Sequence, residues 1–266
     1  MKNLVLLKIG GSICTEKGKN KFRVREKAVA RIAREITDAR KEKEFRLLVV
    51  NGAGPFGHTN VTEYDIDNGL RNEKDYEGFA KTVNDCSYLN WKVSDIMRKE
   101  GILSLPFPSS SVVIQGKRKI STFFTDSLKA LWNSNWSIVP VMNGTMVADT
   151  EMKGSVVSGD AVLEHIAARF SPDFMIFVTD VDGIFTGDPK KNRRARLIER
   201  ISKDGYGDIK KHISGSSNVD VTGGMLGKVE KMLELKTRTI IINGNAPGRV
   251  RKALLGETVR GTVLGK

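Results

Sequence analysis

The chain has 266 residues, 39% of them hydrophobic, which suits one large domain or two lobes that share a sheet. No apolar run approaches the roughly 20 residues of a membrane-spanning helix, and no signal-peptide pattern follows Met1, so we expect a cytoplasmic protein. With two cysteines and three histidines, the composition argues against a disulfide framework and against a histidine-rich metal site.

The formal net charge of +13 has two interpretations. A basic chain can bind nucleic acid, or it can carry a basic surface around a pocket for a small polyanion. The lysines and arginines are spread through amphipathic segments, and few aromatic residues lie between them. We therefore favour a pocket that attracts phosphates, and we expect neither a nucleic-acid partner nor a membrane partner.

Strand-like and helix-like segments alternate along the whole chain. Strands are predicted at residues 2–9, 45–50, 103–113, 137–142, 174–180, 239–242 and 261–264, and helices at residues 24–44, 76–100, 126–134 and 161–169. Such alternation predicts an α/β fold whose open, mostly parallel sheet is covered by helices on both faces. Ligands of such sheets bind beyond the carboxyl ends of the strands.

The most informative stretch runs from Asn51 to His58, with the sequence NGAGPFGH. It leaves a buried strand, and a helix-like segment follows it. Glycines at such an exit let a ligand approach the backbone closely, and the N-terminus of the helix adds N–H groups that favour anions. His58 closes the stretch as a further hydrogen-bond donor. A purely structural turn with a surface histidine is the alternative.

A second glycine-rich turn, Gly10-Gly11-Ser12, follows the first strand directly. Lys8 lies at the end of that strand, where its ammonium group can reach an anion held by the glycines, and Lys17 lies on the loop beyond. Because Lys8 interrupts an otherwise apolar strand, we prefer a functional role for it over that of an ordinary edge lysine.

Acidic residues follow two of the later strands. Either Ser158 or Asp160 can cap the helix predicted at residues 161–169, and Asp160 can instead organise nearby lysines. Asp180 and Asp182 leave the next strand, where they can bind Mg²⁺ or nucleotide or simply form local turns. A third glycine loop, with Gly223, then opens a helix that contains Lys228.

Six motifs occur in the order found in the amino acid kinase superfamily. Together they resemble this superfamily and, within it, the isopentenyl phosphate kinases. The motifs are KIGGS from Lys8, FGH from Phe56, SGD from Ser158, TDVDG from Thr179, DVTGG from Asp220 with Lys228, and NGN from Asn243. The histidine after Phe-Gly distinguishes this branch from the acetylglutamate, aspartate and uridylate kinases. The resemblance covers nearly the full length of the chain.

The resemblance implies a three-layer αβα sandwich that forms a homodimer. It implies an acceptor lobe at about residues 1–170, an ATP-binding lobe at about residues 171–266, and ATP with Mg²⁺ as cofactors. The implied reaction is phosphorylation of isopentenyl phosphate to the diphosphate, in an alternative mevalonate pathway of isoprenoid biosynthesis. A kinase of another small anion, such as a carboxylate, a nucleotide monophosphate or a phosphonate, is the alternative on the same fold.

The resemblance also assigns roles to residues, although it names no metal ligand. The catalytic set would be Lys8, Lys17, His58, Asp160 and Lys228. The acceptor phosphate would contact Gly11, Ala53, Gly54, Gly57, His58 and Gly159. The nucleotide would contact Lys8, Gly10, Gly11, Ser12, Gly54, Asp180, Gly183, Gly223 and Lys228. The chain departs from the family loop, which begins His-Gly-Gly-Gly or His-Gly-Ala-Gly, by having Asn51 at its start and Pro55 after Gly54.

An isoprenyl tail would need an apolar pocket beside the phosphate site. In the predicted helix at residues 76–100, Phe79, Val83 and Cys86 recur at helical spacing and share one face. This face either belongs to the core or walls the tail pocket, with Phe79 as its floor.

Overall fold

The computed structural model describes residues 3–16, 18, 22–187, 189, 192–207, 209–210, 227, 229–235 and 237–265. An eight-stranded sheet with the order β12-β14-β13-β9-β1-β2-β6-β3 forms its centre. The strands are β1 (Leu4–Ile9), β2 (Arg46–Asn51), β3 (Ser104–Pro106), β6 (Val139–Asn143), β9 (Phe174–Thr179), β12 (Arg200–Ile201), β13 (Arg238–Asn243) and β14 (Gly261–Leu264). Neighbouring strands in this sheet run parallel except β13 and β14, which confirms the predicted sheet type.

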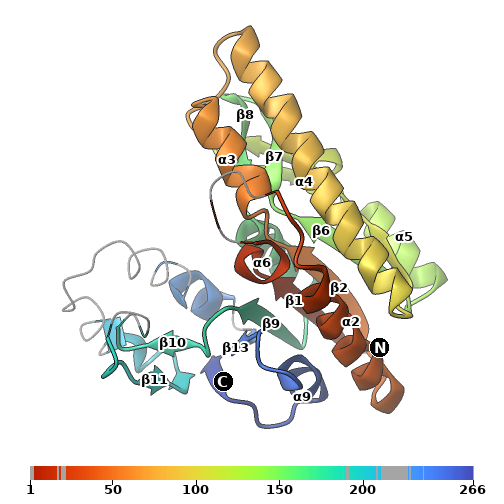
Figure 1. Ribbon diagram of the computed structural model, residues 1–266, viewed down its shortest axis with the longest axis vertical. Coiled ribbons are helices and arrows are strands. Elements are labelled where there is room, and N and C mark those ends of the chain that lie inside the picture. Colours follow the sequence, from red (N-terminus) through yellow and green to blue (C-terminus); the bar gives the residue numbers. More distant parts are fainter. Residues whose placement is uncertain are drawn as a thin grey trace.

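Helices cover both faces of this sheet (Figure 1). One face packs against α2 (Glu26–Glu42), α4 (Glu73–Lys99) and α9 (Arg249–Leu255), and the other packs against α5 (Asp126–Ser134) and α6 (Gly159–Phe170). Residues of β1 alternate between the two cores: Val5 and Leu7 join the first, and Leu4 and Leu6 join the second. Because successive side chains of a strand point to opposite faces, Lys8 lies on the same side as α6.

The prediction of one strand at residues 103–113 was wrong. The segment forms β3, then a 3-10 turn at Ser109–Ser111, and then β4 (Val113–Gly116), which leaves the main sheet. Pro106 and Pro108 have no N–H group to donate to a strand ladder, so the strand ends where they occur. The 3-10 turn is held by Asn143, whose side-chain oxygen accepts from the N–H of Ser109 at 3.1 Å.

A second, four-stranded sheet with the order β5-β4-β7-β8 was not predicted. It contains β5 (Lys119–Phe123), β7 (Thr145–Asp149) and β8 (Lys153–Val157), and it lies beside α3 (Pro55–Glu63) and the start of α4 (Figure 1). A short hairpin of β10 (Ile184–Phe185) and β11 (Leu197–Ile198) lies in the other half of the molecule, with α9 and β13. In the described part of the chain, no helix combines the length and the apolar character that crossing a membrane requires.

Candidate active site

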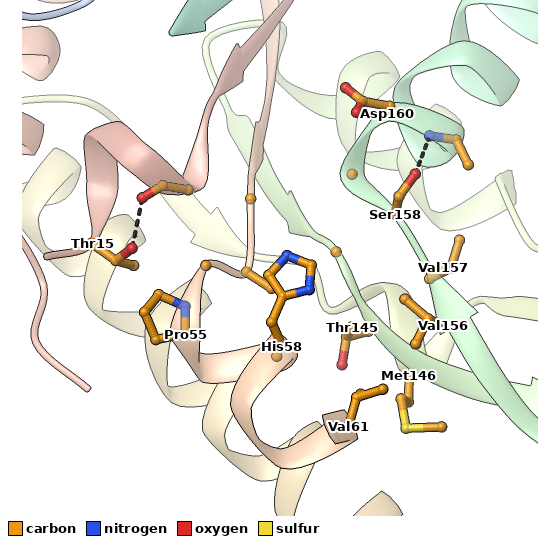
Figure 2. Close-up of a pocket in the computed structure, with 18 of the residues that line it drawn as sticks. Thr15, Pro55, His58, Val61, Thr145, Met146, Val156, Val157, Ser158 and Asp160 are labelled. Carbon is orange, nitrogen blue, oxygen red and sulfur yellow. Dashed lines mark hydrogen bonds between the residues drawn. The ribbon is translucent and has the colours of Figure 1, made fainter. Parts of the chain in front are cut away.

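A cavity of about 980 Å³ opens where β1 and β2 end. Its lining brings together residues that are far apart in the sequence, and Figure 2 shows the side chains that surround it. Of the predicted site residues, the lining contains Lys8, Gly11, Ser12, Ala53, Gly54, Gly57, His58, Gly159 and Asp160. These residues therefore converge at the strand ends in the folded chain.

The two glycine-rich turns meet backbone to backbone beneath this cavity. A Cβ atom added to Gly52 would lie 2.5 Å from the amide nitrogen of Gly11, and one added to Gly11 would lie 2.8 Å from that of Gly54. These distances are too short for any side chain, so the close approach requires glycine. Gly54 also has φ +53° and ψ −141°, a conformation essentially restricted to glycine.

His58 enters the cavity from the first turn of α3. The helix begins with Pro55 after the N-cap residue Gly54, and the N–H of His58 donates to the carbonyl of Gly54 at 3.1 Å. Figure 2 shows the imidazole projecting between the glycine turn and Ser158. Proline is well tolerated here, because the first N–H of a helix has no partner inside the helix. Pro55 nevertheless lacks a backbone N–H group, so the N-terminus of α3 has one donor fewer to offer an anion.

Asn51 lies behind the cavity rather than in its lining. Its side chain is fully buried and accepts a hydrogen bond from Asn90 of α4 at 2.9 Å, and Asn90 also donates to the carbonyl of Val141 at 2.9 Å. The departure from the family loop at Asn51 therefore places an amide in a buried polar contact that joins α4 to the end of β2 and to the middle of β6.

Lys8 and Asp160 form an ion pair at the edge of the cavity. Their side chains are only 14% and 12% exposed, and the Lys8 ammonium lies 5.8 Å from the centre of the Phe177 ring. Ser158 is the residue that caps α6, since its hydroxyl accepts from the N–H of Ala161 at 3.1 Å. Asp160 is therefore placed to orient Lys8, which is the second of the two roles considered for it.

Asp180 links the first glycine turn to the exit of β9. Its carboxylate accepts a hydrogen bond from the Ser12 hydroxyl at 3.2 Å. Within the described residues, Gly10, Asp180 and Gly183 do not belong to the cavity lining. Gly183 packs instead against Thr262, whose hydroxyl oxygen would lie 2.4 Å from an added Cβ. Roles for these three residues in nucleotide binding stay predictions.

Asp182 is held in a polar cluster away from the cavity. It accepts hydrogen bonds from Arg249 at 2.6 Å, Arg260 at 2.7 Å and Asn243 at 3.1 Å. Burial by itself would raise the pKa of Asp182, but these donors outweigh burial and lower the pKa to about 2. The cluster ties the loop after β9 to the end of β13, to the start of α9 and to the residue just before β14, which supports a structural role for Asp182.

Replacing Asp182 with asparagine is expected to destabilise the protein in a pH-dependent way. The folded-state pKa of about 2 lies below the ordinary value of 3.8. The ionised carboxylate therefore contributes about 2 kcal/mol above pH 4, and this contribution is lost as the pH falls toward 2. Urea unfolding at pH 7 and at pH 3 should show a free-energy difference between wild type and Asp182→Asn that shrinks at the lower pH. A difference independent of pH would contradict this account.

One end of the cavity is apolar. Val61 of α3, Met146 of β7 and Val156 of β8 line it and lie together in Figure 2. This end could hold a short apolar group beside the polar end.

The residues predicted to form a tail pocket lie behind this lining. In the described structure the lining includes none of Phe79, Val83 and Cys86, and Thr82 is the α4 residue that reaches it. Phe79 and Val83 pack in the same apolar cluster as Met146, behind the lining. Cys86 is fully buried beneath Gly57, where an added Cβ would lie 3.5 Å from its Sγ atom. Phe79 therefore does not form the floor of the cavity as predicted, but lies in a second layer behind its lining.

Both cysteines are expected to resist alkylation in the folded protein. Burial raises the pKa of the Cys14 thiol and of the Cys86 thiol to about 12, so almost no thiolate exists near neutral pH. Iodoacetamide at pH 8 should leave the native chain unmodified and should modify both thiols in denaturant, as measured by mass spectrometry. Modification of the native chain at the rate of a free thiol would show that one site opens.

Three predicted residues, Lys17, Gly223 and Lys228, lie outside the described residues. The lining residues that were not predicted include Glu164 and Lys231. Glu164 follows Asp160 by four residues on α6, so the spacing places both carboxylates on one face. Lys231 lies near Glu164, with Nζ 3.8 Å from Oε2. The sequence signal for Glu164 was available in this spacing, but no motif marks Lys231.

Comparison with known proteins agrees with this arrangement. The family model described as "Amino acid kinase family" matches residues 3–246. The isopentenyl phosphate kinase of Methanothermobacter thermautotrophicus is 37% identical over 268 residues, which covers 97% of this chain and 98% of that protein. The isopentenyl phosphate kinase of Methanocaldococcus jannaschii is 32% identical, with 97% of each chain covered. A solved structure, described as an X-ray structure of isopentenyl phosphate kinase, superposes with a TM-score of 0.82 at 34% identity and covers 98% of this chain and 99% of that one. The chain belongs to the amino acid kinase family.

Proposed function

We propose that this chain transfers the γ-phosphoryl group of ATP to isopentenyl phosphate. The observation that carries the proposal is the division of the cavity into two chemically different ends. Lys8, His58 and the glycine turns surround one end, and Val61, Met146 and Val156 form the other. A phosphate with a short apolar tail matches both ends, and the similarity to enzymes named isopentenyl phosphate kinase supports the same acceptor.

The chemistry requires positioning and charge neutralisation more than a base. A phosphate monoester has a second pKa of about 6, so it is mainly a dianion at pH 7 and its oxygen is already a nucleophile. That oxygen attacks the γ-phosphorus, a new P–O bond forms, and the bond to the bridging oxygen breaks so that ADP leaves with the electron pair. Lys8 offsets the negative charge that gathers during the transfer, and His58 donates to the acceptor phosphate.

Carboxylates in the cavity provide oxygen ligands of the kind that Mg²⁺ prefers. Asp160 and Glu164 both line it, and Asp160 is already paired with Lys8. A Mg²⁺ ion would accompany ATP and would be held mainly by its phosphates and by water, where it neutralises phosphate charge. The described residues contain no group of three or more side chains typical of a resident metal site.

We further propose that residues up to about 170 bind the acceptor and that residues beyond about 171 bind ATP. His58 and the apolar end belong to the first part, and Gly227 and Lys231 enter the cavity from the second. We also propose that the chain forms a homodimer, that it acts in the cytoplasm, and that its product enters isoprenoid biosynthesis. Light scattering of the purified chain measures the oligomeric state directly.

A panel of acceptors tests the proposed reaction. The chain is incubated with Mg-ATP and isopentenyl phosphate, dimethylallyl phosphate, acetylglutamate, aspartate, UMP or fosfomycin, and ADP and the phosphorylated product are measured. Isopentenyl diphosphate is expected as the product formed with the highest kcat/KM. A higher kcat/KM for a carboxylate, a nucleotide or a phosphonate would replace the proposed acceptor with that class.

A further inference from the structure

The segment between α3 and α4, residues 64–72, closes the side of the molecule next to the apolar end of the cavity. Its side chains Ile66 and Leu70 are almost completely buried, and they pack in one cluster with Met146 and with Val61 and Val156, which line the cavity. Asp67 of the same segment lies at the cavity itself. The position of this segment therefore determines how much space lies behind the apolar wall.

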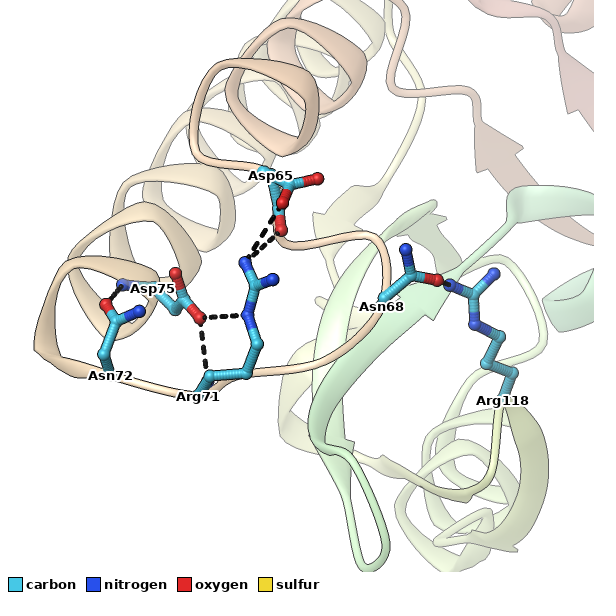
Figure 3. Close-up of polar contacts among 6 residues, drawn as sticks. All are labelled: Asp65, Asn68, Arg71, Asn72, Asp75 and Arg118. Carbon is cyan, nitrogen blue, oxygen red and sulfur yellow. Dashed lines mark hydrogen bonds and ion pairs between the residues drawn. The ribbon is translucent and has the colours of Figure 1, made fainter.

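Part of the segment is fixed by its own contacts (Figure 3). Arg71 pairs with Asp75 at 3.0 Å and with Asp65 at 3.2 Å, and Asn72 caps α4 by accepting from the N–H of Asp75 at 3.2 Å. These contacts shape the segment and join it to α4. They do not join it to the small sheet, which carries Met146 and Val156.

Besides the apolar packing of Ile66 and Leu70, polar contacts of Leu70 and Arg118 make that connection. The N–H of Leu70 donates to the carbonyl of Met152 at 3.0 Å. Arg118, at the turn between β4 and β5, donates through Nη2 to the carbonyl of Asp67 and to the side chain of Asn68, and it lies 3.3 Å from the carboxylate of Asp67. Figure 3 shows the Arg118 side chain reaching across to Asn68.

Arg118 is itself held rigidly. It has φ +65°, and its N–H donates to the carboxylate of Asp149 at 2.9 Å, while its carbonyl accepts from Gln115 at 3.1 Å. The same Asp149 carboxylate accepts from the N–H of Met152 at 2.9 Å. One buried carboxylate thus fixes both turns that hold residues 64–72.

We propose that Arg118 is a positioning residue that sets the length of acceptor tail the cavity admits, an inference that rests on the proposed function. Arg118 holds residues 64–72 against the small sheet, and this keeps Ile66 and Leu70 packed behind the apolar wall. Without the guanidinium, the segment moves away from the sheet, the wall loses its backing, and a longer tail gains room. Arg118 acts through this segment and does not contact the acceptor.

The test compares Arg118→Ala with Lys117→Ala, a matched control at the same turn. Lys117 also has a positive φ, +49°, so both alanine variants place the same residue in a left-handed conformation. For Arg118→Ala we expect KM for isopentenyl phosphate to rise on the order of tenfold, as for the loss of charge-assisted hydrogen bonds at a half-exposed site. The ratio of kcat/KM for geranyl phosphate to that for isopentenyl phosphate should rise by a similar factor. KM for ATP should not change, and Arg118→Lys should restore part of the effect.

Amide hydrogen exchange gives a second readout that does not depend on turnover. Exchange within residues 64–72 should increase in Arg118→Ala and should stay at the wild-type rate in Lys117→Ala. An unchanged acceptor ratio in folded Arg118→Ala, or an equal change in Lys117→Ala, overturns the proposal. Faster exchange without a change in the ratio also overturns it, because the segment would then not set tail length. Wild-type protein that does not phosphorylate isopentenyl phosphate refutes the proposed function first, and this inference with it.

Discussion

Replacing Lys8 with alanine is expected to lower kcat by about 10³-fold or more, which is the scale of losing a preorganised charge from a site that stabilises developing negative charge. Lys8 is the described lysine that is both nearly buried and paired inside the cavity, with its side chain 14% exposed beside Asp160. In the proposed reaction the ammonium would meet the phosphoryl group in a region shielded from water, where charge interactions are stronger than at the surface. Steady-state kinetics with saturating ATP and acceptor measure the loss.

Two further variants separate catalysis from folding. Lys8→Met keeps much of the side-chain volume, and Lys129→Ala removes a half-exposed lysine of α5 as a control. Asp160→Asn should also be impaired, because the Lys8 ammonium loses the carboxylate that orients it. The double variant Lys8→Met with Asp160→Asn should lose less than the product of the two single effects, since paired residues act as a unit. Independent losses from the two residues would mean that the observed ion pair has no part in the reaction.

Replacing His58 with alanine is expected to lower kcat about 100-fold while the affinity for ATP stays nearly unchanged. The imidazole extends from the first turn of α3 into the cavity, beside the glycine turn that would hold the acceptor phosphate. A hydrogen bond to this phosphate strengthens as charge moves during transfer, so its loss affects the transition state more than the nucleotide complex. Kinetics give kcat, and calorimetric titration with a non-hydrolysable ATP analogue gives the affinity.

His58→Gln is the informative companion because glutamine retains an N–H donor. It should keep more activity than His58→Ala if donation is the main role of the side chain. A control on the same helix is Thr62→Ala, which changes an exposed residue of α3 outside the cavity lining. Wild-type kcat/KM in His58→Ala would show that the loop from Asn51 to His58 does not hold the acceptor.

The hydrophobic pattern by itself determined the layered fold. Apolar runs such as residues 45–50 and 174–179 must be buried on both faces, so they form interior parallel strands, and the helical spacing of residues 26–42 and 73–99 supplies the covering layers. The glycines at the strand exits and the lysine inside an apolar strand were also visible in the sequence. Local rules were sufficient for these features, because each depends on residues that are close together in the chain.

The tertiary structure decided which chemically suitable residues meet. The sequence left two roles each for Asp160 and Asp182, and both assignments depend on partners more than 60 residues away: Lys8 for Asp160, and Arg249 and Arg260 for Asp182. The small sheet was missed because its strands are short and lie among turn residues, and it supplies Met146 and Val156 at the apolar end of the cavity. Because this sheet was missed, Phe79 was predicted in the cavity, whereas it lies behind the lining to which Met146 and Val156 belong. Helical spacing shows that a residue faces inward, whereas only the packing of other elements shows whether a neighbour stands between it and the ligand.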